Sequence, residues 1–211
     1  MDRLERVALR IGEVIANSTV PEDPEHSRNT REWLLKLDPK ADGALRIAAL
    51  GHDIDRAVAE RKVRRADFAD YDTFKAAHAR NSATIVGEIM RECCVEDEAL
   101  TGEVQRLVCL HEVGGDPRSD LLKDADSLSY FDVNLPHYAQ RHGWQETRRR
   151  CVWGYLRLSE GARSIAAGLP YPSDELQRLM DESIREAETL ARARSREPTV
   201  GRSGSGSAVD C

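Results

Sequence analysis

Apolar residues recur three and four positions apart along most of this chain, which is the spacing of one face of an α-helix. Leu4, Val7 and Ile11 follow this spacing near the start, and Leu176 and Met180 follow it near the end. Residue types that favour strands are scarce, and aromatic residues make up only 5% of the chain. The sequence therefore predicts an all-α protein built as a helical bundle.

The periodic segments predict a series of helices separated by turn-forming residues. The first predicted helix covers residues 2–17, and the second follows a break at 17–24 and runs to about residue 37. The others cover residues 44–60, 73–94, 96–112, 118–135, 145–167 and 173–195. Residues 61–72 are polar and predict a loop or a frayed helix end. With 211 residues, the chain suits one helical domain over 1–171, with a C-terminal amphipathic helix over 172–195 packing on it. The Gly- and Ser-rich residues 196–211 predict a disordered tail.

The charge and the apolar segments exclude several classes of protein. The net charge of −6 argues against nucleic-acid binding through overall positive charge. No segment reaches the roughly 18 uninterrupted apolar residues of a membrane span. The first residues predict a charged amphipathic helix and lack the apolar core of a signal peptide. We therefore expect a cytoplasmic protein that binds neither membrane nor nucleic acid.

Four of the six histidines are predicted to lie on apolar faces of four different helices: His26, His52, His78 and His111. His26, His78 and His111 are predicted to point inward, because each lies at helical spacing from an apolar residue of its own helix: Trp33, Phe74 and Leu107 in that order. The second lies next to Asp53 inside an apolar run over residues 44–54, where an unpartnered polar group would be costly. A single histidine of this kind is usually a hydrogen-bonded core residue. Four on neighbouring helices predict one polar site, and helical bundles build metal sites in this way.

Carboxylates complete the predicted site. Asp53 adjoins the second histidine, and Asp124 and Asp126 lie within an apolar helix, where spacing alone does not choose between them. Imidazole and carboxylate ligands suit Mn, Fe, Co, Ni or Zn. Three or four protein ligands leave positions open for water and substrate, which is typical of a catalytic site.

The order of these residues resembles the HD-domain metal-dependent phosphohydrolase superfamily, whose all-helical domain carries His, His-Asp and Asp on successive helices. Here the matching residues are His26, His52 with Asp53, and Asp126 in the sequence Ala-Asp-Ser-Leu over 125–128. The resemblance covers about residues 5–165. It implies that these four residues bind the metal, with Asp126 rather than Asp124 as the last ligand.

Two further histidines resemble those of the binuclear branch of the superfamily. His78 also lies in a segment, 75–83, similar to a His-x-x-x-Ser-Ala helix of uncharacterised HD families. The resemblance implies that His78 and His111 bind a second ion or, with one ion, contact the substrate phosphate or a metal-bound water. Asp53 could bridge two ions through its two oxygens. Asp53, His78 and His111 are therefore the predicted catalytic residues.

Basic residues near these positions are candidates for binding the substrate phosphate: Arg56, Arg61, Arg64, Arg65, Lys75 and Arg80. Arg56 lies about one helical turn beyond Asp53, and the loop over 61–65 could fold back over the site. Guanidinium groups bind phosphate with two parallel hydrogen bonds. The alternative for the 61–65 cluster is a solvated charged loop.

These features together favour a phosphohydrolase that cleaves a phosphate ester of a small molecule, a nucleotide above all, through a metal-activated water. One alternative is a non-catalytic protein that binds metal and nucleotide, with the C-terminal helix serving a partner or a homodimer. Another is a diiron oxygenase, since such a branch exists in the superfamily. Hydrolysis of guanosine tetraphosphate is disfavoured. Those enzymes usually carry an acidic pair shortly after His-Asp, whereas here Asp55 matches only in part and Arg56 reverses the charge.

Overall fold

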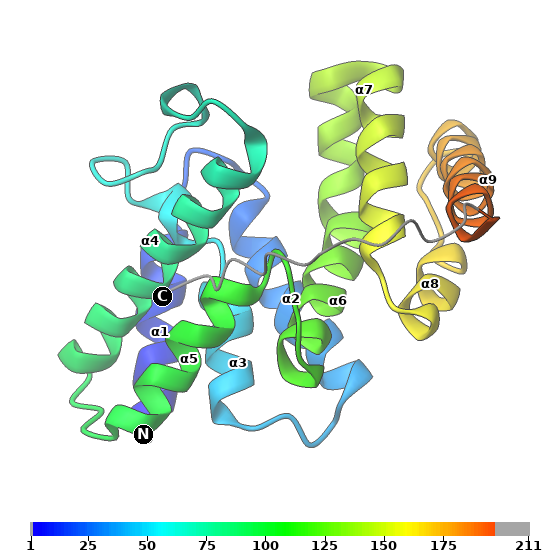
Figure 1. Cartoon of the computed structure of the whole chain (residues 1–211). Helices are drawn as coiled ribbons and strands as arrows, with labels where there is room; N and C mark the ends of the chain where they lie inside the picture. The colour runs from blue at the N-terminus through cyan, green and yellow to red at the C-terminus, as the bar shows by residue number, and fades with distance from the viewer. Residues whose placement is uncertain (1, 197–211) are drawn as a thin grey trace. The chain divides into compact units, whose positions relative to one another are not determined.

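The computed structural model describes residues 2–196, and its secondary structure is entirely helical in that range, as predicted. The α-helices, shown in Figure 1, are α1 (Arg3–Ile15), α2 (Asp23–Leu37), α3 (Gly43–Gly51), α4 (Tyr71–Glu92), α5 (Glu98–Leu110), α6 (Pro117–Ser129), α7 (Leu135–Arg157), α8 (Glu160–Ala167) and α9 (Asp174–Arg196). Three short segments complete them: the 3₁₀ turns η1 (Ile54–Ala57) and η2 (Arg65–Asp67), and the π-helical turn η3 (Tyr130–Asn134).

The chain divides into two compact units, Met1–Asn134 and Leu135–Cys211. The division falls at Asn134, whereas the sequence places the end of the main helical domain at residue 171. The predicted C-terminal helix is present as α9. The predicted tail lies, from residue 197 onward, outside the described residues.

In the first unit, α3 is the central helix and contacts α1, α2, α4, α5 and α6. It can take this place because seven of its nine residues are buried, from Ala44 and Leu45 to Gly51. Asp42 caps its start by accepting a hydrogen bond from the backbone N–H of Leu45. The C-terminal end of α3 therefore lies deep in the unit, with helices on several sides of the residues that follow it.

The predicted helix over 44–60 is wrong beyond Gly51, where α3 ends. The chain turns at His52 and Asp53 and continues as η1. The Asp55 carboxylate is drawn inward by hydrogen bonds from the backbone N–H of Val63 and the ring of His78, which a continued helix would not allow. Gly51 permits a close approach to α4, since a Cβ there would lie 2.5 Å from Cγ2 of Val86. The turn thus places Asp53 and Asp55 beside α4.

The second unit is built mainly from the packing of α7 against α9, with α8 also contacting α9. Gly143 interrupts α7 with a φ of 73°, a conformation that favours glycine. The single helix predicted over 145–167 is two helices. The first ends at Arg157, and Ser159 begins the next by accepting a hydrogen bond from the N–H of Ala162.

None of the helices in residues 2–196 combines the length and the apolar character that crossing a lipid bilayer requires.

Candidate metal centre

The site begins at the turn after α3, where His52 is completely buried. Its Nδ1 donates to the backbone carbonyl of Ala49 at 3.0 Å, so Nε2 is the ring nitrogen that points away from its own helix. His26 of α2 approaches from the other side, with its Nε2 3.2 Å from Nε2 of His52. Asp126 of α6 completes the group, because its Oδ1 lies 3.3 Å and 3.4 Å from those two nitrogens.

These separations match the geometry of ligands around one ion. Two atoms that bind the same ion at about 2.1 Å lie about 3.0–3.4 Å apart for octahedral or tetrahedral angles. All three separations among His26, His52 and Asp126 fall in that range, and the two rings are almost entirely buried. This first group could therefore hold a metal ion. It also selects between the two aspartates left open by spacing, because Asp124 belongs to neither candidate group.

A second group lies beside the first and consists of Asp53, His78 and His111. Nε2 of His78, on α4, is 2.8 Å from Oδ1 of Asp53, and Nε2 of His111, directly after α5, is 3.8 Å from the same oxygen. Both histidines are buried, as their spacing predicts. The second group could also hold a metal ion.

Asp53 lies between the two groups and presents one oxygen to each. Its Oδ1 faces the second group, while its Oδ2 is 3.8 Å from Nε2 of His26 and 3.7 Å from Nε2 of His52. The imidazole rings also adjoin one another, with centroids 5.1 Å apart for His52 and His111 and 6.2 Å apart for His78 and His111. The two groups therefore adjoin, with the carboxylate of Asp53 between them.

Each of the four histidines has its Nδ1 held by the protein. Nδ1 of His26 contacts Oγ of Ser129 at 2.9 Å, and that hydroxyl in turn donates to the carbonyl of His26, so it accepts from the ring. Nδ1 of His111 donates to the carbonyl of Val108 at 2.6 Å. Nδ1 of His78 donates to Oδ2 of Asp55 at 2.8 Å. Such partners fix the tautomer of a metal-binding histidine and leave the Nε2 lone pair for the ion.

The electrostatics of the centre favour added positive charge. Burial opposes ionisation of Asp53, but the guanidinium of Arg56 and the rings of His52 and His78 outweigh it and hold the pKa of Asp53 well below its usual range. Burial likewise lowers the pKa of His52, but the charges of Asp53 and Asp126 prevail and raise it to about 9. A site that binds a proton this strongly between close nitrogens and carboxylates is also suited to a cation.

Of the six candidate phosphate-binding residues, two lie at the candidate metal centre and four lie away from it. Nη2 of Arg56 is 2.9 Å from Oδ2 of Asp53, and Lys75 forms a buried ion pair with Glu112, beside the second group. Arg61 pairs instead with Glu88.

The remaining three basic candidates lie at the surface. The side chains of Arg64, Arg65 and Arg80 are exposed, and Nη1 of Arg65 donates to the carbonyl of Phe68. The structure thus brings only Arg56 and Lys75, of the six, to the metal centre.

Two carboxylates of the centre were not predicted from the sequence as site residues. Asp55 is almost completely buried and holds His78, and Glu112 has an oxygen 3.3 Å from Nε2 of His111. Asp55 lies only two residues after a predicted ligand, and Glu112 directly follows one. This proximity to predicted ligands is the signal that could have identified them.

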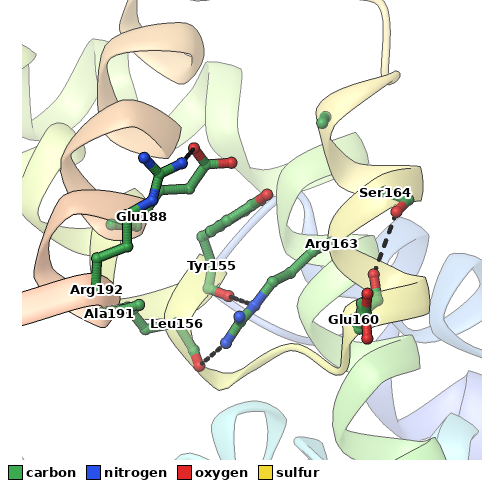
Figure 2. Close-up of a pocket in the computed structure, with 10 residues that line it drawn as sticks. Tyr155, Leu156, Glu160, Arg163, Ser164, Glu188, Ala191 and Arg192 are labelled. Carbon is green, nitrogen blue, oxygen red and sulfur yellow. Dashed lines mark hydrogen bonds and ion pairs between the residues drawn. The ribbon is translucent and has the colours of Figure 1, made fainter. Parts of the chain in front are cut away.

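The second unit carries a pocket of about 430 Å³ among α7, α8 and α9, shown in Figure 2. Both of its arginines pair within the protein. Arg163 donates to the backbone carbonyls of Tyr155 and Leu156 at 3.2 Å and 2.8 Å, and Arg192 pairs with Glu188 at 3.5 Å. The pocket contains neither of the two candidate metal groups found among the described residues.

A family model described as Domain of unknown function (DUF4202) matches residues 11–180, a range that includes every member of both metal groups. No curated protein and no solved structure matches the chain. Because the family model covers most of the sequence, this chain belongs to the family described as Domain of unknown function (DUF4202).

Proposed function

We propose that this protein is a metal-dependent phosphohydrolase that cleaves a phosphate ester of a small molecule. The observation that carries the proposal is the pair of adjoining His and Asp groups, with Asp53 presenting one oxygen toward each and the guanidinium of Arg56 beside them. Two-ion sites of this kind are used to stabilise both the attacking and the leaving oxygen of a phosphoryl transfer. The resemblance to the HD-domain superfamily supports the same reaction class.

The donor set fits divalent transition metals. Imidazole nitrogens and carboxylate oxygens without thiolates suit Mn, Fe, Co, Ni or Zn. His26, His52 and Asp126 would hold one ion, His78 and His111 the other, and Asp53 would contact both. A bound divalent ion would lower the pKa of a coordinated water and so supply a hydroxide nucleophile near neutral pH.

The protein's own residues would bind and orient the substrate. Arg56 is 30% exposed at its side chain, so its guanidinium can reach a phosphate while it stays anchored to Asp53 and Asp23. Its planar donors suit two phosphate oxygens at once. Lys75 is a second cation at the same centre. These residues would place the phosphorus against the nucleophile and offset the charge that develops during transfer.

Aromatic side chains next to the second group favour a substrate with a ring, such as a nucleotide. The ring of Phe74 lies nearly parallel to that of His78, with centroids 6.3 Å apart. Phe68 and Tyr71 contact Phe74 at centroid distances of 6.1 Å and 5.9 Å, and Tyr71 is partly exposed. Such a surface offers stacking to a base, whereas a sugar phosphate would gain less from it.

The proposal is tested with metal-free protein reloaded separately with Mn, Fe, Co, Ni or Zn and assayed for phosphate release from nucleotides and phosphomonoesters. We expect release with at least one metal and one substrate, and its loss in Asp53→Asn. Asp97→Asn is the matched control, because that aspartate caps α5 away from both groups and asparagine also caps helices.

Absence of phosphate release with every metal would contradict the proposal, as would full activity of Asp53→Asn. Calorimetric binding of metal and nucleotide without turnover would instead indicate a binding protein. An iron-dependent visible absorption together with oxygen consumption would indicate an oxygenase.

A further inference from the structure

Glu112 lies in the turn directly after His111, and its side chain is only 7% exposed. Its Oε1 is 3.3 Å from Nε2 of His111 and also pairs with the ammonium group of Lys75 from α4. A buried carboxylate is costly unless it is paired or binds a metal. Glu112 thus stands at the edge of the second group, with a ligand nitrogen on one side and a cation on the other.

The distance between Glu112 and His111 is of the kind seen within the first group, where donor atoms lie 3.2–3.4 Å apart. One ion could therefore touch both Oε1 of Glu112 and Nε2 of His111. The first group has Asp126 as a carboxylate of its own in addition to the shared Asp53. Without Glu112, the second group has only the shared Asp53.

Adding Glu112 makes the two groups equivalent in composition. Each then has two histidines, one carboxylate of its own and one oxygen of Asp53. We propose that Glu112 is a metal ligand of the second group and that Lys75 is a positioning residue, whose ammonium holds the carboxylate in place when no ion is bound. The inference rests on the metal centre of the proposed function, but not on catalysis.

Lys75 is suited to this role because it lies three residues before His78, on the same face of α4. The residue is 9% exposed, so its charge needs a partner in the protein, and Glu112 provides it. An ammonium so close to the second group also opposes the binding of a cation there. Glu112 and Lys75 should therefore affect the second ion in opposite directions.

The experiment is a calorimetric titration of metal-free protein with Co²⁺, together with elemental analysis after desalting. We expect two ions per wild-type chain. Glu112→Gln should weaken one of them at least about 100-fold, beyond the 10- to 100-fold typical of outer partners, and leave the other unchanged. Lys75→Met should strengthen the second ion about tenfold, whereas a purely structural role for Lys75 would weaken it.

The double variant Lys75→Met/Glu112→Gln removes both buried charges together, so neither is left unpaired, and it should show the same loss of the second ion as Glu112→Gln. Glu88→Gln is the control, since that glutamate pairs with Arg61 at the surface.

The inference is overturned if Glu112→Gln or the double variant binds two ions with wild-type affinity, or if the wild type binds only one ion. A wild type that binds two ions yet releases no phosphate would contradict the proposed function alone.

Discussion

The candidate metal centre of the first unit and the pocket of the second both contain charged side chains, yet the interactions of those side chains differ in kind. In the pocket, Arg163 donates to two backbone carbonyls and Arg192 faces Glu188, so each cation has an acceptor. In the centre, by contrast, Nε2 atoms of His26 and His52 face each other at 3.2 Å. Internal pairing explains the pocket without any ligand, whereas two facing imidazole lone pairs call for a cation or a proton between them.

The largest expected effect comes from replacing a ligand of the candidate metal centre, whereas a substitution in the pocket should have no effect. Asp126→Asn should abolish the first ion and lower phosphate release at least about 1,000-fold, because it removes a ligand rather than an outer partner. Arg163→Met, which removes a charge in the pocket, should leave both ion stoichiometry and phosphate release unchanged. Elemental analysis and steady-state assays measure both. A loss of activity in Arg163→Met with both ions retained would assign the pocket a part in the reaction.

Removing the metal should destabilise the first unit by a smaller but measurable amount. An ion present at 100 times its dissociation constant adds about 2.7 kcal/mol, which corresponds to a Tm increase of about 5–10 °C for a chain of this size. Trp33 reports on the first unit, and Trp144 and Trp153 report on the second.

Fluorescence melting with and without chelator should therefore be compared in Trp33→Phe and in the double variant Trp144→Phe/Trp153→Phe. The shift should be the larger where Trp33 is retained. Equal Tm shifts in the two proteins would mean that the two units unfold together and that the ion stabilises both of them.

The smallest of the three effects is expected from Asp55→Asn, which leaves every proposed ligand in place. The carboxylate of Asp55 orients His78 and accepts from the N–H of Val63, and loss of such an outer partner typically costs 10- to 100-fold in metal affinity. Titration should show this loss at one ion only. Asp67→Asn, an exposed change in η2, is the matched control. An unchanged affinity in Asp55→Asn would show that the orientation of His78 does not depend on this carboxylate.

Much of the centre could be predicted because the helical spacing of apolar residues indicates which side chains of a helix are buried. His78 and His111 share faces with apolar residues, and a side chain on such a face must point into the unit. The turn at Asp53 could not be predicted in this way. The apolar run continues through Ile54, so its pattern favours a longer helix, and the bonds that end the helix come from residues distant in sequence.

Partners of charged side chains were the least predictable part. Arg61 and Arg56 lie five residues apart, yet one pairs with Glu88 on α4 and the other with Asp53. The partner of Arg56 is local, since Asp53 lies three residues before it, whereas the partner of Arg61 depends on how α4 packs. The break at Ser159 is different, since a serine followed by Glu160 is a recognisable helix start.

The anchoring of the four histidine rings has a consequence for how the centre would bind a metal ion. Two backbone carbonyls, one hydroxyl and one carboxylate hold the Nδ1 atoms, so the contacts that orient the rings do not involve an ion. The centre would then act as a preassembled chelator, with little reorganisation on binding and little power to reject ions of similar size. Which metal the protein carries would then be set by the supply of metals around it.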